Sequence, residues 1–416
     1  MTYRLHTPQQ LLSNTIHLSG SKSISNRILI IKALSGLSFD IINLSDSDDT
    51  KYLKKALGNY ATTPLIDVGH AGTDMRFLTA FLATKPGDFE LTGSERLQQR
   101  PVKDLVEVLL KLGANITYTN KEGYPPLLIK GANLQGGNIE MNGNVSSQFI
   151  TALLLIAPYF TNGLQLTIIN ELVSKPYVHM TIELMKKFGA SVVWQDNVIT
   201  VQPVPYTCHH SQFTVETDWS AASYYYSIVA LSPIHTKLKI NGLFANSVQA
   251  DAESEIIYKN FGVITHYHDT HIEIIKDTQP NLNAVFDYDF INCPDIAQTV
   301  SCTCVGLQIP FYFKGLQTLK VKETDRIIAL KNEIKKLGFD LEVTNDSINL
   351  CSYDSTLNAD LVSIATYNDH RMAMSFATLC IVKDNLIIED AGVVSKSYPL
   401  FWEHLKSIGI SIDVLT

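Results

Sequence analysis

Six segments along the chain share a pattern, in which a polar or small residue is followed by a run of apolar residues. The run 152–158 (Ala-Leu-Leu-Leu-Ile-Ala-Pro) is apolar on all sides, which indicates a helix buried inside a domain. The first two starts are 50 residues apart, and the later steps are 73, 73, 77 and 74. The six segments begin at Ser23, Thr73, Ser146, Trp219, Ile296 and His370.

A second pattern recurs at similar spacing: an amphipathic helix that ends in a large apolar residue and a glycine. A glycine just past a helix suits the left-handed backbone conformation that terminates it. Strand-like runs follow most of these glycines, for example 190–194 and 339–343. Each unit thus carries two helices and several short strands. The six pairs are Leu57-Gly58, Leu112-Gly113, Phe188-Gly189, Phe261-Gly262, Leu337-Gly338 and Ile408-Gly409.

Both patterns predict six similar units, three in each half of an α/β protein. We expect two domains with pseudo-threefold symmetry, buried helices at the centre and sheets outside. The predicted domains are 20–217, and 1–19 together with 218–416. A length of 416 residues suits two domains of about 200 residues each. An ordinary open α/β fold is the alternative.

The formal net charge of −8 and the pI near 5.8 argue against nucleic acid or an anionic membrane as the partner. Any anion that binds must therefore meet locally clustered Lys and Arg side chains. The N-terminus lacks the apolar stretch of a signal peptide, and no apolar run approaches the roughly 18 residues of a membrane span. We expect a cytoplasmic protein whose six cysteines are reduced thiols.

The starts of the predicted buried helices carry side chains suited to anions. A helix N-terminus offers free N–H groups and a partial positive charge. A single capping serine or a single arginine is usually structural, but several equivalent starts carry such groups here. They are Lys22, Ser23 and Arg27; Gly72 and Arg76; Ser146, Ser147 and Gln148; and Arg371.

Further charged residues lie between these helices. Arg100 and Pro101 are expected to begin the second helix of the second unit. Lys322 and Arg326 are four residues apart, which would place them on one helix face beside Glu323. Asp295 is expected to cap a buried helix or to accept a proton, and Lys396 lies near the C-terminus.

Eight segments together resemble the 5-enolpyruvylshikimate-3-phosphate (EPSP) synthase family, also called 3-phosphoshikimate 1-carboxyvinyltransferase. They occur in family order from residue 20 to residue 399, so the resemblance spans nearly the whole chain. GSKSISNR, VKETDR and NDHRMAM are highly specific in combination. The segments are GSKSISNR, AGTDMRFLTA, LTGSERLQQRP, SSQFITALL, LVSKPY, KVKETDR, TYNDHRMAMSF and SKSYP.

The resemblance implies two inside-out α/β barrels, each of three βαβαββ repeats, with the active site in the interdomain cleft. It implies transfer of the enolpyruvyl group of phosphoenolpyruvate to the 5-hydroxyl of shikimate 3-phosphate, without a metal or organic cofactor. We expect a monomer that binds these two small molecules, with no nucleic acid or membrane partner.

The resemblance also implies site residues. Asp295, Glu323 and Lys22 would be catalytic. The shikimate 3-phosphate contacts would be Lys22, Ser23, Arg27, Ser146, Ser147, Gln148, Ser174, Asp295 and Lys322. The phosphoenolpyruvate contacts would be Lys22, Gly72, Arg100, Gln148, Arg326, Arg371 and Lys396.

The sequence departs from the family pattern at three positions. His70 stands where Asn usually precedes Ala-Gly-Thr, and His179 stands where Asp is common. Thr318 occupies the place of a frequent Asn contact to the shikimate ligand, so that role is not assigned to it.

Two alternative functions remain open. The sibling enolpyruvyl transferase that acts on UDP-N-acetylglucosamine usually carries a cysteine in the loop corresponding to 91–101, which contains none here. A non-catalytic anion-binding relative is the second alternative. Cys302-Thr-Cys304 lacks a second ligand pair at zinc-like spacing, and Tyr224-Tyr-Tyr is expected to pack within a buried helix.

Overall fold

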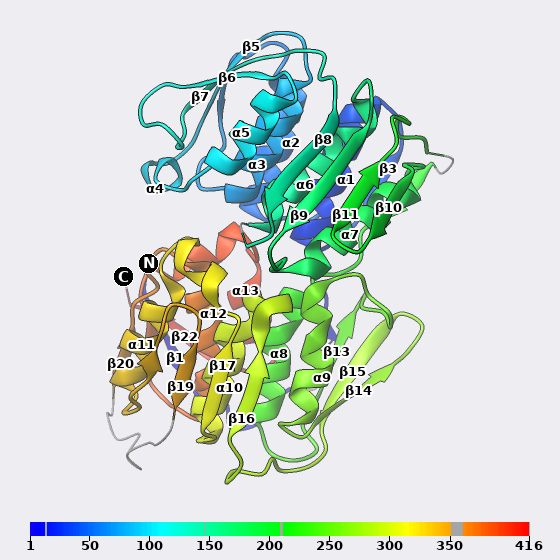
Figure 1. The fold of residues 1–416 in the computed structure, drawn as a ribbon. Helices are drawn as coiled ribbons and strands as arrows, with labels where there is room; N and C mark the ends of the chain where they lie inside the picture. The colour runs from blue at the N-terminus through cyan, green and yellow to red at the C-terminus, as the bar shows by residue number, and fades with distance from the viewer. Residues whose placement is uncertain (13–14, 145, 209–210, 351–360, 416) are drawn as a thin grey trace. The chain divides into compact units, whose positions relative to one another are not determined.

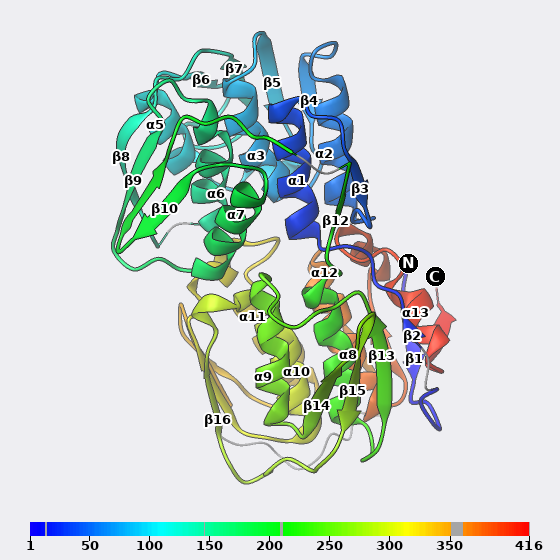
Figure 2. The same cartoon turned by 90° about the vertical axis from the view of Figure 1, so that its right-hand side faces the viewer.

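The chain forms two compact units. The computed structural model describes residues 1–12, 15–144, 146–208, 211–350 and 361–415. The central unit is the continuous stretch Gly20–Val215, and the terminal unit joins Met1–Ser19 to Glu216–Thr416. Figures 1 and 2 label the elements of both units.

Three helices fill the middle of each unit, and their predicted starts are confirmed to within one residue. In the central unit α1, α3 and α6 contact one another, and in the terminal unit α10 contacts both α8 and α12. Every residue of α3 except Thr73 is buried, and every residue of α8 except Ser220. The six helices are α1 (Lys22–Ser35), α3 (Gly72–Ala83), α6 (Ser147–Ile156), α8 (Trp219–Leu231), α10 (Ala297–Leu307) and α12 (His370–Ala377).

Five four-stranded sheets share one topology. In each, two strands pair in parallel, a buried helix leads into the second of them, and two further strands extend the sheet antiparallel from that second strand. In the central unit the orders are β4-β5-β7-β6 and β8-β9-β11-β10. These strands are β4 (Leu65–Asp67), β5 (Asp88–Thr92), β6 (Asn115–Tyr118), β7 (Leu127–Lys130), β8 (Gly137–Asn142), β9 (Leu164–Ile169), β10 (Val192–Gln195) and β11 (Val198–Val201).

The terminal unit has three such sheets, with orders β14-β15-β13-β2, β16-β17-β19-β18 and β20-β21-β1-β22. β1, from the N-terminal segment, lies between β21 and β22, so the last sheet is completed by a strand from the other end of the sequence. The strands are β1 (Tyr3–His6), β2 (Thr15–Ile16), β13 (Lys237–Asn241), β14 (Val263–Tyr267), β15 (His271–Lys276), β16 (Phe286–Asp289), β17 (Phe311–Lys314), β18 (Glu342–Val343), β19 (Ile348–Leu350), β20 (Val362–Ile364), β21 (Leu386–Ile388) and β22 (Ser411–Val414).

The second helix of each repeat ends as predicted in five of the six cases. Gly113, Gly189, Gly262, Gly338 and Gly409 all have positive φ just past a helix. These second helices are α2 (Asp48–Asn59), α5 (Lys103–Lys111), α7 (Lys175–Lys187), α9 (Ser254–Lys259), α11 (Arg326–Lys336) and α13 (Phe401–Ser407).

The first repeat differs from the other five: the βαβαββ order expected of all six repeats is not seen there among the described residues. Gly58 lies inside α2 rather than after it, and the described chain passes from α2 to β4 without a hairpin. Within the described part of the chain, β3 (Asp40–Ile42) and β12 (Gln212–Thr214) form the one strand pair of this repeat, and they are parallel. The missing hairpin accounts for the short first step of 50 residues in the sequence pattern.

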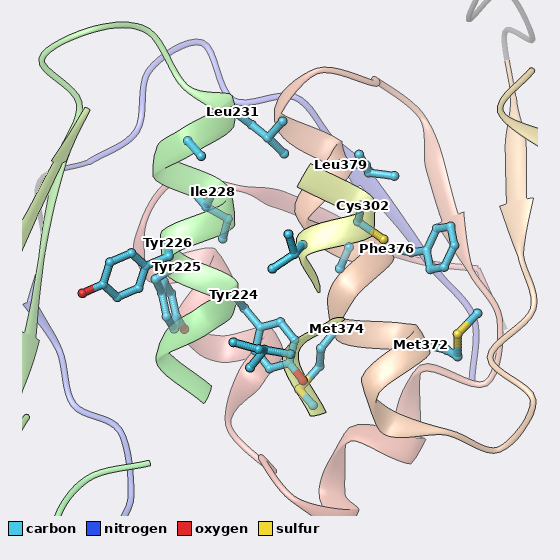
Figure 3. Close-up of a cluster of buried hydrophobic side chains, with 14 of the residues drawn as sticks. Tyr224, Tyr225, Tyr226, Ile228, Leu231, Cys302, Met372, Met374, Phe376 and Leu379 are labelled. Carbon is cyan, nitrogen blue, oxygen red and sulfur yellow. The ribbon is translucent and has the colours of Figure 1, made fainter. Parts of the chain in front are cut away.

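The core of the terminal unit is built from the same helices. Figure 3 shows Tyr224 of α8, Cys302 of α10 and Met374 of α12 turned toward the space between these helices. Tyr225 and Tyr226 are fully buried, and their hydroxyl groups bond to Tyr398 and Thr265 at 2.7 Å each. The packing role predicted for 224–226 is thus confirmed.

The five cysteines within the described residues are free thiols, and Cys351 lies outside those residues. Among the described residues, no helix has the length and apolar character needed to cross a membrane.

Candidate active site

The first turns of the three buried helices in the central unit are tied to one another by side chains. Asn26 of α1 donates from Nδ2 to Asp74 Oδ1 of α3 at 3.0 Å. Gln148 of α6 donates from Nε2 to Thr73 Oγ1 of α3 at 3.1 Å. The three N-termini therefore lie at one end of the unit, as an anion site requires.

Lys22 begins α1 and is held by a carboxylate. Its Nζ lies 3.1 Å from Asp49 Oδ2, and Nε2 of His70 lies 3.6 Å from Asp49 Oδ1. Burial, followed by the negative charge of Asp49, raises the pKa of the nearby Asp74 well above its usual value. Burial thus favours the protonated form of Asp74, while Asp49 is the carboxylate that contacts Lys22.

Arg27 is a buried cation bonded to neutral oxygens. Its Nε donates to Thr181 Oγ1 at 2.8 Å, and its Nη1 donates to the Ser23 carbonyl at 2.7 Å. Nη2 lies 3.4 Å from both Thr151 Oγ1 and the Tyr177 carbonyl. Burial lowers the pKa of Arg27 to about 10, so the side chain stays charged at neutral pH.

Arg100 lies directly against Gly72. A Cβ atom built on Gly72 would lie 2.7 Å from Arg100 Cζ. Arg76 supports this contact, because it donates to the carbonyl of Gly72 and to that of Pro101, each at 2.9 Å. A charged guanidinium is therefore held over the start of α3.

The prediction that Arg100 and Pro101 begin a helix is wrong. α4 (Glu95–Gln98) ends before them, and α5 begins at Lys103 after the N-cap Val102. Both residues lie in the link between the helices, where Arg100 reaches the start of α3 and the Pro101 carbonyl accepts from Arg76.

Three serines complete the predicted set in the central unit. Ser146 caps α6 by accepting from the backbone N–H of Gln148 at 3.3 Å, which leaves its hydroxyl hydrogen available. Ser147 is half-buried in the same turn. Ser174 is buried before α7 and has φ 56°, a left-handed conformation that few serines adopt and that clusters at functional sites.

In the terminal unit, Asp295 is surrounded by three cations. Arg371 Nη2 lies 3.0 Å from Oδ2, while Arg326 Nη1 and Lys322 Nζ lie 3.3 and 3.4 Å from Oδ1. Burial alone would raise the pKa of Asp295, but Arg371, Lys322 and Arg326 together hold it well below its usual range. Asp295 is therefore ionised.

Asp295 does not cap a helix, contrary to the prediction. It lies in the short 3₁₀ helix η4 (Pro294–Ile296), and Ile296 precedes the first residue of α10. Its carboxylate accepts from arginine side chains instead of from the backbone of α10.

Arg326 is 1% exposed and bonds to three carboxylates. Nε and Nη2 contact Asp369 at 2.7 and 3.3 Å, and Nη2 also contacts Glu323 at 2.9 Å. Burial alone would lower the pKa of Arg326, but these carboxylates together with that of Asp295 raise it instead.

The prediction that Lys322 and Arg326 lie on one face of a helix is wrong. α11 begins at Arg326, because Asp325 caps it by accepting from Ile328 N at 3.2 Å. Lys322 precedes the helix, and the two cations are related through their shared contact with Asp295.

The start of α12 carries the remaining predicted cations. Asp369 caps this helix by accepting from Arg371 N at 2.8 Å. Lys396, at the end of η7 (Ala391–Lys396), donates from Nζ to the Asn368 carbonyl at 2.6 Å. Lys396 therefore lies beside the start of α12.

Sequence reasoning missed the acids that position these cations, namely Asp49 and Asp369, and also missed Asp251 beside Arg371. Asp49 belongs to Asp46-Ser-Asp-Asp, which has the composition of a calcium loop but lacks its Gly and Glu. Among the described residues, no group of three or more His, Cys, Asp or Glu side chains could hold a metal.

The three departures from the family pattern have distinct surroundings. His70 contacts Asp49 as described, and its ring meets that of Tyr52 edge-on. His179 stacks on Trp194 with ring centroids 4.3 Å apart, so it contributes to packing between α7 and β10. Thr318 lies in η5 (Gln317–Val321).

The family model described as EPSP synthase (3-phosphoshikimate 1-carboxyvinyltransferase) matches residues 58–405. A 3-phosphoshikimate 1-carboxyvinyltransferase of Bacteroides fragilis (strain YCH46) is 49% identical over 419 residues, covering 100% of this chain and 99% of the relative. One of Vibrio cholerae serotype O1 (strain M66-2) is 34% identical and covers 96% and 98%, respectively.

Solved structures agree on the fold. A structure of EPSP synthase from Acinetobacter baumannii matches with a TM-score of 0.75 and 19% sequence identity, and the match covers 100% of both chains. A second structure from the same organism matches with a TM-score of 0.76 and 18% identity. The chain therefore has the mixed α/β fold of these structures.

Proposed function

Because this chain belongs to the EPSP synthase family, we propose that the charged clusters of both its units act on one pair of substrates. The enzyme transfers the enolpyruvyl group of phosphoenolpyruvate to the 5-hydroxyl of shikimate 3-phosphate and releases phosphate. This reaction is a step of the shikimate pathway, which leads to chorismate and the aromatic amino acids.

The surroundings of Asp295 are the observation that carries this proposal. A half-buried carboxylate with one lysine and two arginines around it is an anion site with a built-in proton acceptor. Both substrates are phosphorylated acids, so they need several cations, and they also need a group that can accept a hydroxyl proton. The sibling reaction on a nucleotide sugar remains the alternative.

The central cluster supplies the phosphate-binding groups in this proposal. Lys22, Ser23, Arg27, Ser146, Ser147, Gln148 and Ser174, together with Asp295 and Lys322 of the terminal unit, would contact shikimate 3-phosphate. Phosphoenolpyruvate would contact Lys22, Gly72, Arg100, Gln148, Arg326, Arg371 and Lys396.

The proposed chemistry has two steps. In addition, the 5-hydroxyl oxygen bonds to C2 of phosphoenolpyruvate, its proton passes to a base, and C3 gains a proton to become a methyl group. In elimination, the bond from C2 to the phosphate oxygen breaks, phosphate leaves with the electron pair, and C3 loses a proton. The double bond is thereby restored as an enol ether.

We assign the proton transfers to Asp295 and Glu323, with Lys22 stabilising the charge that develops on the phosphate. Arg371 would bind the substrate carboxylate, as arginine forks prefer. This binding would draw Arg371 from Asp295, so the pKa of Asp295 would rise toward that of a useful base.

The finer architecture belongs to the same proposal. Each unit would be an inside-out barrel, with its helices at the centre and its sheets outside. We also propose a monomer located in the cytoplasm, which sedimentation and cell fractionation would test. A dimer would contradict the former and a membrane-bound fraction the latter.

Phosphate release measured with two acceptors tests the reaction. We expect turnover with shikimate 3-phosphate and none with UDP-N-acetylglucosamine. Asp295→Asn and Lys22→Met should each lower kcat/KM by about 10²- to 10⁴-fold. Glu342→Gln, an exposed acid of β18, is the control and should match the wild type. Turnover of only the nucleotide sugar, or full activity of Asp295→Asn, would overturn the proposal.

A further inference from the structure

A chain of polar contacts leads from Asp295 to Asp251, an acid that is buried. Arg371 donates from Nη2 to Asp295 Oδ2 at 3.0 Å and to Ser220 Oγ at 3.4 Å. The Ser220 hydroxyl in turn donates to Oδ2 of Asp251. Asp251 lies in the 3₁₀ helix η2 (Ala250–Glu253) and is 3% exposed.

The direction of the Ser220 hydrogen bond matters for Arg371. A serine hydroxyl has a single hydrogen and two lone pairs. Because that hydrogen points at the Asp251 carboxylate, the lone pairs remain to accept the N–H of Arg371. The same nitrogen of Arg371 therefore lies between two acceptors, one on η4 and one on α8.

The position of Ser220 in its helix supports a role beyond packing. It is the only residue of α8 that is not buried, and it lies in the first turn, where the helix N-terminus begins. Asp218 caps this turn by accepting from Ala221 N at 3.1 Å, so Ser220 is not needed for that cap.

We propose that Asp251 is a positioning residue for Arg371: through the Ser220 hydroxyl it fixes the guanidinium in the orientation that receives the carboxylate of phosphoenolpyruvate. This inference rests on the proposed function of Arg371. Asp251 itself touches no substrate in this proposal. When the substrate draws Arg371 from Asp295, the Ser220 contact keeps the side chain in place.

The protonation of Asp251 offers a readout that a purely structural role would lack. Burial raises the pKa of Asp251 to about 6, although the positive charge of Arg371 opposes this shift. The other groups that face it are Asp295 of η4, Asp218 at the start of α8, and Cys293. Asp251 is therefore mostly ionised at neutral pH and mostly protonated about one pH unit below its pKa.

The test compares wild type with Asp251→Asn across pH, with phosphoenolpyruvate varied at saturating shikimate 3-phosphate. We expect KM for phosphoenolpyruvate to rise about tenfold near neutral pH, with kcat within about twofold, because a hydrogen-bonded charge is lost. The ratio of KM values should fall toward one by about pH 5, where wild-type Asp251 is also protonated. Ionisation of the substrate affects both enzymes equally and cancels in the ratio.

Two further variants complete the design. Ser220→Ala breaks the bridge and should raise KM similarly, so it carries the test if Asp251→Asn does not fold. Glu253→Gln is the control, because Glu253 lies in the same short helix but accepts from the Tyr288 hydroxyl and not from Ser220. It should leave KM unchanged.

A KM ratio near one at neutral pH, or a ratio that does not change with pH, would overturn the positioning role. Absence of phosphate release in the wild type would instead contradict the proposed function, so the two failures can be told apart.

Discussion

Arg326 and Arg27 are both buried arginines, yet their surroundings differ. Arg326 bonds to three carboxylates, which keep it charged and fix its direction. Arg27 donates to two hydroxyl and two carbonyl oxygens, and these neutral partners do not cancel its charge. An uncancelled buried cation attracts an anion more strongly than a paired one does, which suits Arg27 to a phosphate.

At the same scale, Asp74 should behave as a neutral acid. Its raised pKa means that the folded chain keeps a proton that the unfolded chain releases above about pH 4. Between the pKa of Asp74 in the unfolded chain and its raised pKa in the folded chain, wild-type stability therefore falls as pH rises. Asp74→Asn has no such proton to lose. We expect the free energy of unfolding of Asp74→Asn to be within about 1 kcal/mol of wild type at low pH, and to exceed it at pH 8 in urea titrations. A difference that shrinks with pH would contradict this.

Lys276 should have the opposite effect from Asp74: its contribution to stability should increase as pH rises. It is fully buried and donates from Nζ to the carbonyls of Ala230 and Phe261 at 2.8 and 2.6 Å. Burial lowers its pKa from 10.5 to about 8. Between these values the unfolded chain binds a proton that the folded chain lacks, so folding becomes more favourable as pH rises. Denaturant unfolding should show wild type gaining stability relative to Lys276→Met between pH 8 and about pH 10; a constant difference would exclude the shift.

At the scale of elements, three of the buried helices, α3, α6 and α8, expose residues only in their first turns. Thr73 of α3, Ser147 and Gln148 of α6, and Ser220 of α8 are the examples. The remaining residues of these three helices are buried, so the polar groups of the first turns are the ones that can reach a ligand. Packing and binding are thereby separated along each helix.

Gly72→Ala should change this binding end without harming the fold. The added Cβ would displace the Arg100 guanidinium, and we expect KM for phosphoenolpyruvate to rise about tenfold or more. Stability should stay equal or rise slightly, because alanine favours a helix. Gly58→Ala, in open space within α2, is the matched control: it should stabilise by about 0.5 to 1 kcal/mol and leave KM unchanged. Steady-state kinetics and thermal melts check both variants, and an unchanged KM for Gly72→Ala would contradict the role of Arg100.

Sequence periodicity predicted the six buried helices because their apolar runs are local and regular. It failed at Lys322, Pro101 and Asp295, where capping and loop geometry set the boundaries of the helices. Periodicity could not find the contact of Asp251 with Ser220, since the residues are 31 positions apart and meet only through packing of η2 on α8. The residue types alone indicated that the site binds anions. The acids that position its cations could be identified only from the folded structure.

At the scale of the whole molecule, the two units differ in continuity. The fragment 20–215 contains every element of the central unit, so we expect it to fold alone with a cooperative thermal transition and native-like circular dichroism. The fragment 216–416 lacks β1 and its fully buried Leu5, which costs about 2 to 5 kcal/mol at that side chain alone. It should fold only when a peptide of residues 1–19 is added. Cooperative folding of 216–416 without the peptide would contradict the prediction.

The place of β1 also sets an order of events during synthesis. Roughly 380 residues separate β1 from β21 along the chain, which a ribosome takes about 20 to 80 s to translate. The central unit can complete its three helices in that interval, while the apolar face of β1 has no strand to pair with. Nascent chains of this enzyme therefore carry an unpaired β-strand for most of their synthesis, and a chaperone that binds extended apolar segments would find it there.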